Sequence, residues 1–314
     1  MILRKASTAA FFVVCLVALA MVFSVSLYAQ QKPGLHGQTM VKQGAGKTRT
    51  ITIVNNCKQN IWWASFGDAK AGGGFFASPG GGGDILAPGG RTTITVTLEK
   101  ETPSSPETIW HGRFWPRTGC NFNKDGIGMC ETGRCQDRLK CVGAGFTGVP
   151  PASLIEATFN EAVYDTYDLS YVDGTNVPVQ IKPTAAKYPP PRSDKLGCGA
   201  PKCTFNFAKE ANSTDESSCL NKLKFRNNKG AVVGCYSACD VDAIENNNMT
   251  NNPNCCTGNY FGPVGRKDYG NCPPTASAQF FLQKCSDPYP WPQGDLAATY
   301  VCVSSSYEIT FCPQ

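Results

Sequence analysis

Residues 154–174 read LIEATFNEAVYDTYDLSYVDG, and this stretch decides the fold. Two segments rich in β-branched and aromatic residues flank a polar break, which predicts a β-hairpin with its turn near Ala162. Such a hairpin places Glu156 opposite the step from Asp168 to the next residue. Carboxylates that face each other across paired strands are destabilising. The acids Glu156, Asp168 and Asp173 therefore indicate either neutralisation by basic partners or a cleft where carboxylates act on a ligand, and we favour the cleft.

The N-terminal segment predicts export. A basic start that includes Arg4 and Lys5 precedes an apolar run at 9–27, and the small residue Ala29 follows. This order is typical of a secretory signal, here residues 1–29. The run is long enough for an uncleaved membrane anchor to stay an alternative. No later stretch is apolar enough to span a bilayer, so we expect a secreted, extracellular protein without a stable membrane span after signal removal.

The cysteines agree with export. Of 17 cysteines, Cys15 lies in the apolar run, and the remaining 16 between Cys57 and Cys312 form an even number. In an exported chain this predicts disulfides rather than free thiols or metal ligands, with the pairing left open by spacing alone. The only histidines, His36 and His111, have no partner at ligand spacing. We therefore expect no metal and no cofactor.

The net positive charge of the chain is too small to indicate a polyanionic partner. The formal net charge is +5, and removal of residues 1–29 leaves 27 basic against 24 acidic residues, or +3. Nucleic-acid-binding proteins carry far stronger basic patches, so no nucleic-acid partner is expected. Protease triads fit poorly because His111 is the one histidine within the fold, where we place it on a strand or at the rim of the cleft.

The chain alternates short strands with turns. Residues 30–49 predict a flexible basic arm outside the fold, and the glycine clusters at 69–83 predict a loop. Further strands are predicted at 50–54, 61–65, 91–98, 108–117, 177–181, 299–302 and 307–311. The proline-rich stretch 182–192 predicts a connector, and 277–284 is the only helical turn expected in the cysteine-rich part. Many short strands between glycine and proline turns predict a mainly β fold, a sandwich with a disulfide-rich insertion.

Seven motifs occur in a recognisable order. They are ITIVNNC at Ile51, GRFWPRTGC at Gly112, GMCETGRC at Gly128, TYDLSYVDGTNVP at Thr166, NPNCCTG at Asn252, FFLQKCSDPYP at Phe280 and YEITFCP at Tyr307. With these motifs and 16 cysteines, the sequence resembles the thaumatin-like family of plant pathogenesis-related defence proteins from about residue 50 to residue 314.

The resemblance implies a flattened antiparallel β-sandwich core with two inserted disulfide-rich lobes and eight disulfides. The core would span about 50–117, 152–200 and 286–314, the small excursion about 118–151 and the larger lobe about 201–285. The implied disulfides are Cys57–Cys312, Cys120–Cys130, Cys135–Cys141, Cys198–Cys302, Cys203–Cys285, Cys219–Cys235, Cys239–Cys255 and Cys256–Cys272.

The resemblance also implies a cleft between the sandwich and the larger lobe. By motif, its five residues are Arg113, Glu156, Asp168, Asp173 and Asp287. The family ligand would be β-1,3-glucan or another cell-wall polysaccharide, bound by a monomer. One departure stands out, because the family's aspartate in Thr-Gly-Asp-Cys is replaced here by Arg134.

Three functions follow from these expectations. The first is an antifungal defence protein that binds β-1,3-glucan in the acidic cleft, with Arg113 neutralising part of the acid. The second is a weak endo-β-1,3-glucanase that uses a pair of carboxyls. In that enzyme Glu156, among aromatic strand neighbours, would be the proton donor, and Asp173, solvated at a turn, would be the ionised base or nucleophile. The third is an inhibitor of a foreign hydrolase or a stress-response protein.

Two smaller expectations concern the surface. Tyr167, Tyr171 and Phe114 would either stack on sugar rings or belong to the core, and aromatic residues at strand spacing more often belong to the core. Asn212 and Asn248 begin Asn-x-Thr or Asn-x-Ser triplets, which are glycosylation acceptors in an exported chain.

Overall fold

The computed structural model describes residues 45–144, 148–209, 212, 214–261 and 272–314. The predicted signal segment and the predicted arm up to residue 44 lie outside the described residues. Within the described residues, no helix has both the length and the apolar character needed to cross a membrane.

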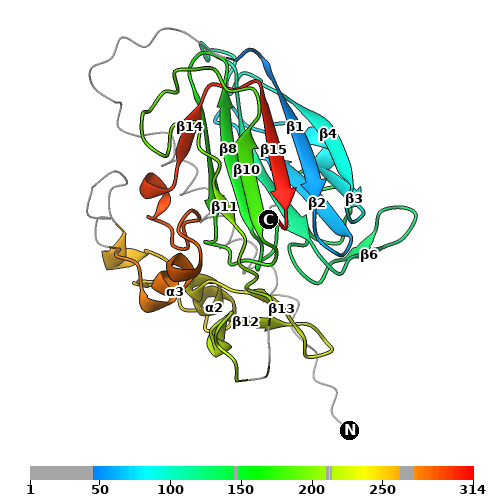
Figure 1. Cartoon of the computed structure of the whole chain (residues 1–314), viewed down its shortest axis with the longest axis vertical. Helices are drawn as coiled ribbons and strands as arrows, with labels where there is room; N and C mark the ends of the chain where they lie inside the picture. The colour runs from blue at the N-terminus through cyan, green and yellow to red at the C-terminus, as the bar shows by residue number, and fades with distance from the viewer. Residues whose placement is uncertain (1–44, 145–147, 210–211, 213, 262–271) are drawn as a thin grey trace.

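Two β-sheets pack face to face, which confirms the predicted sandwich (Figure 1). The five-stranded sheet has the order β11-β10-β15-β1-β4, and the six-stranded sheet has the order β14-β9-β8-β5-β2-β3. The strands of the first are β1 (Thr48–Asn55), β4 (Arg91–Thr97), β10 (Val179–Pro183), β11 (Lys202–Cys203) and β15 (Ser306–Phe311). Those of the second are β2 (Ile61–Gly67), β3 (Gly83–Leu86), β5 (Ile109–Arg117), β8 (Leu154–Asn160), β9 (Asp165–Ser170) and β14 (Tyr300–Cys302). Neighbouring strands of these sheets pair antiparallel except β1 and β15, which pair parallel.

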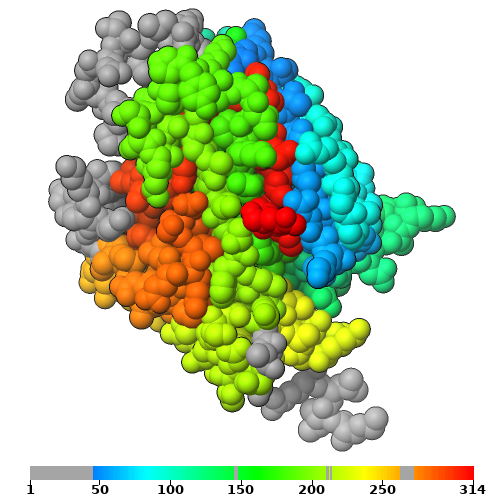
Figure 2. Space-filling model, viewed as in Figure 1, coloured from blue at the N-terminus to red at the C-terminus, as the bar shows by residue number. Residues whose placement is uncertain are grey.

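Two groups of small elements extend from the sandwich. The small excursion contains β6 (Asn121–Phe122) and β7 (Gly128–Met129). The larger lobe contains η2 (Asn221–Leu223), β12 (Lys224–Arg226), β13 (Val232–Cys235), α2 (Ala238–Ile244), η3 (Gly258–Tyr260) and α3 (Ala276–Lys284). The short 3₁₀ turns η1 (Pro79–Gly82) and η4 (Asp295–Ala297) complete the fold. Figure 1 shows the larger lobe below the sandwich, and Figure 2 shows their surfaces in close contact.

Two predictions about local structure were wrong. We expected residues 277–284, which form most of α3, to be the only helical turn in the cysteine-rich part, but α2 also forms there. Ser237 caps its first turn by accepting from the backbone N–H of Asp240, and the Asp240 side chain accepts from Ser237 N–H in return. The predicted glycine loop also ends in β3, whose residues pair with β2.

The predicted flexible arm is part of the fold at its C-terminal end. β1 begins at Thr48, and Arg49 is completely buried. The guanidinium of Arg49 donates to both carboxylate oxygens of Asp165, each at 2.8 Å. The hydroxyl of Tyr307 donates to the same carboxylate at 2.7 Å. A buried charge needs such partners, so Arg49 pairs with Asp165 inside the sandwich rather than in solvent.

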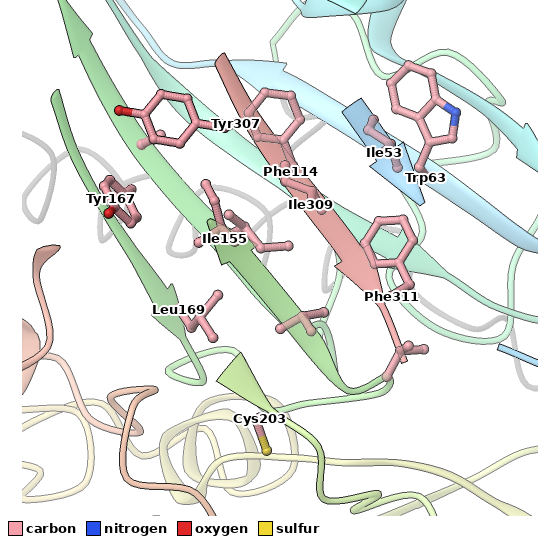
Figure 3. Packing of buried hydrophobic residues seen from close by; sticks show 14 of the residues in the cluster. Ile53, Trp63, Phe114, Ile155, Tyr167, Leu169, Cys203, Tyr307, Ile309 and Phe311 are labelled. Atoms are coloured by element: carbon pink, nitrogen blue, oxygen red, sulfur yellow. The ribbon is translucent and has the colours of Figure 1, made fainter. Parts of the chain in front are cut away.

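The main core lies between the sheets (Figure 3). β8 shows how alternation builds it, because Ile155 and Phe159 are fully buried while Glu156 points to the opposite face. Tyr307 and Phe311 of β15 close the core from the five-stranded sheet. The outer face of the six-stranded sheet carries Glu156, and it also carries a second, smaller hydrophobic cluster that includes Phe66, Trp115 and Leu154.

Eight disulfides cross-link the described residues, within the core, within the small excursion and within the larger lobe. They join Cys57–Cys312, Cys120–Cys130, Cys135–Cys141, Cys198–Cys302, Cys203–Cys285, Cys219–Cys235, Cys239–Cys255 and Cys256–Cys272. These are the pairs that the family resemblance implies. The first spans 255 residues and ties the start of the core to its end, which by the loop-entropy argument restricts the unfolded chain most.

Candidate functional site

A row of charged residues crosses three strands on the outer face of the six-stranded sheet. Arg113 on β5 is paired with Glu156 on β8, and Glu156 is paired with Asp168 on β9. Residues at paired positions share one face of a sheet, so the three side chains lie side by side. The predicted opposition of Glu156 and Asp168 is confirmed. Together with Asp68 and Asp173, described next, these residues form what we call the acidic cluster.

Arg113 supplies the positive charge at the centre of the cluster. Its side chain is buried, and Nη2 lies 3.3 Å from Asp68 Oδ1 and 3.5 Å from Glu156 Oε1. Burial by itself lowers the pKa of Arg113, but the carboxylates of Asp68, Glu156 and Asp173 outweigh it and raise the pKa above the ordinary value. Arg113 therefore neutralises part of the negative charge of these carboxylates. Without it, bringing the carboxylates together would cost free energy.

Asp68 is a member of the cluster that the sequence did not indicate. It directly follows β2 and is only 9% exposed. Burial alone would raise its pKa, but Arg113 and His111 outweigh burial and hold the pKa below its ordinary value. Nδ1 of His111 lies 3.5 Å from Asp68 Oδ2. Asp68 thus remains ionised and orients Arg113 from the side opposite Glu156.

Tyr289 was also missed, and it holds the other oxygen of Glu156. Its hydroxyl donates to Glu156 Oε2 at 2.6 Å. The backbone fixes this geometry, because Tyr289 N–H donates to Leu169 O at 3.0 Å and Tyr289 O accepts from Tyr171 N–H at 2.9 Å. The segment that follows α3 therefore adds to the sheet edge beside β9. Glu156 accepts from a phenol on one oxygen and faces a guanidinium on the other.

Asp173 lies at the turn where the sheet meets the larger lobe. Gly174 N–H donates to Tyr171 O at 3.0 Å, and Gly174 has φ +68°. A Cβ on Gly174 would lie 2.4 Å from Cys235 O. The turn therefore requires glycine because of its positive φ and because there is no room for a side chain. Burial raises the pKa of Asp173 to about 6, with Arg113 lowering it and the charge of Glu156 raising it. The expectation of a well-solvated, readily ionised Asp173 was wrong, because the lobe covers this turn.

The larger lobe brings a further carboxyl toward Asp173. Asp240, in the first turn of α2, is 6% exposed and accepts from Ser237 N–H at 2.9 Å. Burial and then the charge of Asp173 raise the pKa of Asp240 well above its ordinary value, against the hydrogen bonds from Ser237. The spacing Ser-x-x-Asp at 237–240 is a capping-box signal that could have revealed the helix, but not its position beside Asp173.

Asp287 does not join the cluster. Its Oδ2 accepts from Lys202 N–H at 3.0 Å, and its Oδ1 lies 4.0 Å from Lys195 Nζ. It also interacts with Tyr300, which is paired with Tyr167 on the face of β9 opposite Asp168. None of these contacts joins Asp287 to the other four residues assigned by motif, so its place in the cleft stays a prediction. The charge of Asp295, like those of Asp168 and Glu156, helps burial to raise the pKa of Tyr289.

The aromatic residues considered for sugar stacking are core residues. Phe114, Tyr167 and Tyr171 are each 1% exposed and belong to the main core. The Tyr167 hydroxyl donates to Gly199 O at 2.6 Å. The acidic cluster therefore offers polar groups rather than aromatic faces on the sheet. The two predicted glycosylation acceptors, in contrast, are exposed.

The chemistry of the cluster suits a ligand with many hydroxyl groups. Ionised carboxylates accept hydrogen bonds, and the phenol and guanidinium donate them, so both ends of a hydroxyl find partners. Among the described residues, no group of three or more His, Cys, Asp or Glu side chains is placed to hold a metal ion.

Comparison with known proteins places this chain in a family. A sequence model described as the Thaumatin family matches residues 55–313. Pathogenesis-related protein 5 of Arabidopsis thaliana is 33% identical over 267 residues, covering 84% of this chain and 90% of the relative. Thaumatin-like protein 1 of Pyrus pyrifolia is 32% identical with the same coverage. The chain therefore belongs to the thaumatin family.

Solved structures show a weaker likeness. The thaumatin-like xylanase inhibitor TLXI is 19% identical, with a TM-score of 0.37 over 84% of this chain and 99% of that chain. A superposition of this quality supports no statement about the ligand of the present protein.

Proposed function

We propose that this chain is a secreted defence protein that binds β-1,3-glucan of fungal or similar cell walls through the acidic cluster. The observation that carries the proposal is the arrangement of Arg113, Glu156 and Tyr289, which fixes a carboxylate between two donors on the sheet face beside the larger lobe. The hydroxyl groups of neutral sugars can both donate hydrogen bonds to such a carboxylate and accept them from such donors. Membership in a family whose relatives are named pathogenesis-related supports a defence role.

Retention on insoluble β-1,3-glucan tests the proposal. We expect the disulfide-intact wild type to be retained and the double variant Glu156→Gln, Asp173→Asn to be released at lower salt or in earlier washes. A matched control, Glu107→Gln with Asp125→Asn, makes the same change in charge away from the cluster and should be retained like wild type. Equal retention of all three proteins, or retention of none, would overturn binding at this site.

Weak endo-β-1,3-glucanase activity is a second candidate, favoured by the raised pKa of Asp173. Glycoside hydrolysis needs one protonated and one ionised carboxyl. With its pKa raised to about 6 by burial, Asp173 suits the proton donor, and Glu156, held between Arg113 and Tyr289, is then the base or nucleophile. These roles are the reverse of those expected from the sequence. Reducing sugar released by wild type and lost in either single variant would establish turnover.

The antifungal part of the proposal is separable from turnover. Glu156→Gln removes the charge of the carboxyl but keeps its shape, so a protein that still binds glucan and inhibits fungal growth does not act by hydrolysis. If the wild type is not retained on the glucan and releases no sugar from it, a protein partner is favoured. A foreign hydrolase that this chain inhibits is an example.

Export and state of assembly belong to the same proposal. Eight disulfides need an oxidising compartment to persist. We propose that residues 1–29 are removed and that the mature protein is a monomer with glycans on Asn212 and Asn248. The intact mass before and after glycan removal tests the cleavage and the occupancy, and sedimentation tests the monomer.

A further inference from the structure

A groove lies apart from the acidic cluster. It has a volume of about 500 Å³, within the usual range for small-ligand sites. The small excursion lines it with Glu131 and Arg134, and the β12–β13 region of the larger lobe lines it with Phe225, Arg226 and Tyr236. None of these residues belongs to the acidic cluster. In Figure 1 the excursion (β6) projects from the right of the lower sandwich, and the β12–β13 hairpin lies in the lobe below it.

Arg134 places a positive charge in the wall of the groove. It stands where the family pattern has an aspartate, and its side chain is half-buried in the wall. Throughout the part of the chain that the structure describes, no carboxylate lies within ion-pair distance of Arg134. A guanidinium presents a planar fork of donors that fits a carboxylate with two parallel hydrogen bonds. An anionic group of a ligand therefore has a partner here.

The facing wall provides apolar and hydrogen-bonding surface. The rings of Phe225 and Tyr236 lie edge to face, with centroids 5.1 Å apart. Arg226 adds a second guanidinium, positioned by a hydrogen bond from Nη1 to Gly230 O at 2.8 Å. The one acid of the lining, Glu131, accepts from Asn227 Nδ2 at 3.0 Å across the groove. The two walls thus combine a ring-sized apolar face, hydroxyl and amide partners, and positive charge.

We propose that this groove binds a uronate-bearing oligosaccharide. Arg134 would bind a sugar carboxylate, Phe225 and Tyr236 would pack against the less polar face of a ring, and Glu131 and Asn227 would bind hydroxyls. An acidic peptide would use the guanidinium as well, but it would leave the hydroxyl-binding partners unused. The proposal is independent of glucan binding, since the two sites share no residue.

Calorimetric titration of the full mature chain with tetragalacturonate tests the groove. Wild type should bind, and Arg134→Gln should bind about tenfold more weakly, because a charge-assisted hydrogen bond to the carboxylate is lost. The matched control Arg138→Gln changes an exposed arginine of the same excursion outside the groove and should bind like wild type. Thermal denaturation of each variant confirms that it is folded.

Several outcomes would overturn the assignment. One is equal affinity of wild type and Arg134→Gln for tetragalacturonate, and another is no binding by wild type. Equally tight binding of neutral laminaritetraose that Arg134→Gln weakens to the same extent would show that the charge of the ligand plays no part in the groove. Equally tight binding of tetraglutamate, lost in Arg134→Gln, would assign the groove to acidic peptides instead of saccharides.

Discussion

The hydroxyl of Tyr289 lies 2.6 Å from Oε2 of Glu156, which joins the segment after the larger lobe to the middle of the six-stranded sheet. Arg113 lies 3.5 Å from the other oxygen of the same carboxyl. Glu156 is therefore held by the sheet on one side and by the returning chain on the other. Because Tyr289 lies on the segment that returns from the larger lobe, the position of the Glu156 carboxyl depends on how the lobe packs against the sandwich.

Removal of the Tyr289 hydroxyl should weaken this connection. We expect Tyr289→Phe to lower the free energy of unfolding by about 1 kcal/mol, because a half-buried carboxylate oxygen loses its donor. Chemical denaturation measures the loss. Tyr188→Phe, at a residue that is 75% exposed, is the control and should leave stability unchanged. Equal stability of Tyr289→Phe and wild type would show that the hydrogen bond contributes nothing.

Asp173 should give stability a defined dependence on pH. Its pKa is raised by burial to about 6 in the folded chain, against an ordinary value of 3.8. The folded state binds the proton more tightly, so this contribution is full below about pH 3.8 and is lost as the pH rises through about 6. Asp173→Asn should therefore gain stability relative to wild type over this window, on the order of 1 kcal/mol after screening by solvent.

Urea denaturation at several pH values from 3.5 to 7 measures that difference. Arg113, Glu156 and Asp240 all face Asp173, so the comparison is between variant and wild type rather than with an absolute curve. Asp125→Asn, an exposed acid of the small excursion, is the control and should follow wild type. A constant difference between Asp173→Asn and wild type at all pH values would contradict the raised pKa.

The pair of Arg49 and Asp165 should be strongly coupled. Both side chains are completely buried, and the guanidinium meets the carboxylate at 2.8 Å. Arg49→Met leaves an uncompensated buried acid and should cost about 3–5 kcal/mol of stability. The double variant Arg49→Met, Asp165→Asn should cost less than the sum of the single changes. Additive losses would mean that the two groups do not interact as the structure indicates.

Arg117 should hold the small excursion against the sheet. Its buried guanidinium donates to the carbonyls of Trp63 at 3.1 Å, Arg138 at 3.0 Å and Leu139 at 2.8 Å. Replacement by glutamine removes most of these donors, so amides of residues 120–141 should exchange with solvent at least about tenfold faster, as a locally opened unit does. Arg138→Gln is again the control. Unchanged exchange in Arg117→Gln would contradict this role.

The sequence was sufficient for the hairpin and for the row of charges on it. Alternation of apolar and polar residues fixes which face each side chain takes, so the opposition of Glu156 and Asp168 followed from the turn position alone. The order of the motifs and cysteines indicated the family, and the disulfides have the pairs that the resemblance implied. The start of β1 was missed because a polar residue such as Arg49 is typical of an exposed arm. Arg49 can be buried only because Asp165, which is distant in the sequence, pairs with it.

The rest of the site depends on contacts between distant segments. Asp173 appeared solvated because it stands beside a glycine at a turn, but backbone from the larger lobe covers that turn. Asp68, Asp240 and Tyr289 come from three separate segments, and nothing local to any of them indicates the cluster. Asp287 was assigned by its motif; one residue separates it from Tyr289, and its carboxyl accepts a hydrogen bond from Lys202 N–H.

Titration of the isotope-labelled protein with laminarihexaose, followed by backbone amide chemical shifts, is the most direct test of glucan binding at the acidic cluster. The largest changes should fall on the amides of Glu156, Asp173 and Tyr289, and Glu156→Gln should reduce them at every ligand concentration. Changes confined to the groove around Arg134, or no saturable changes at all, would contradict glucan binding at the acidic cluster.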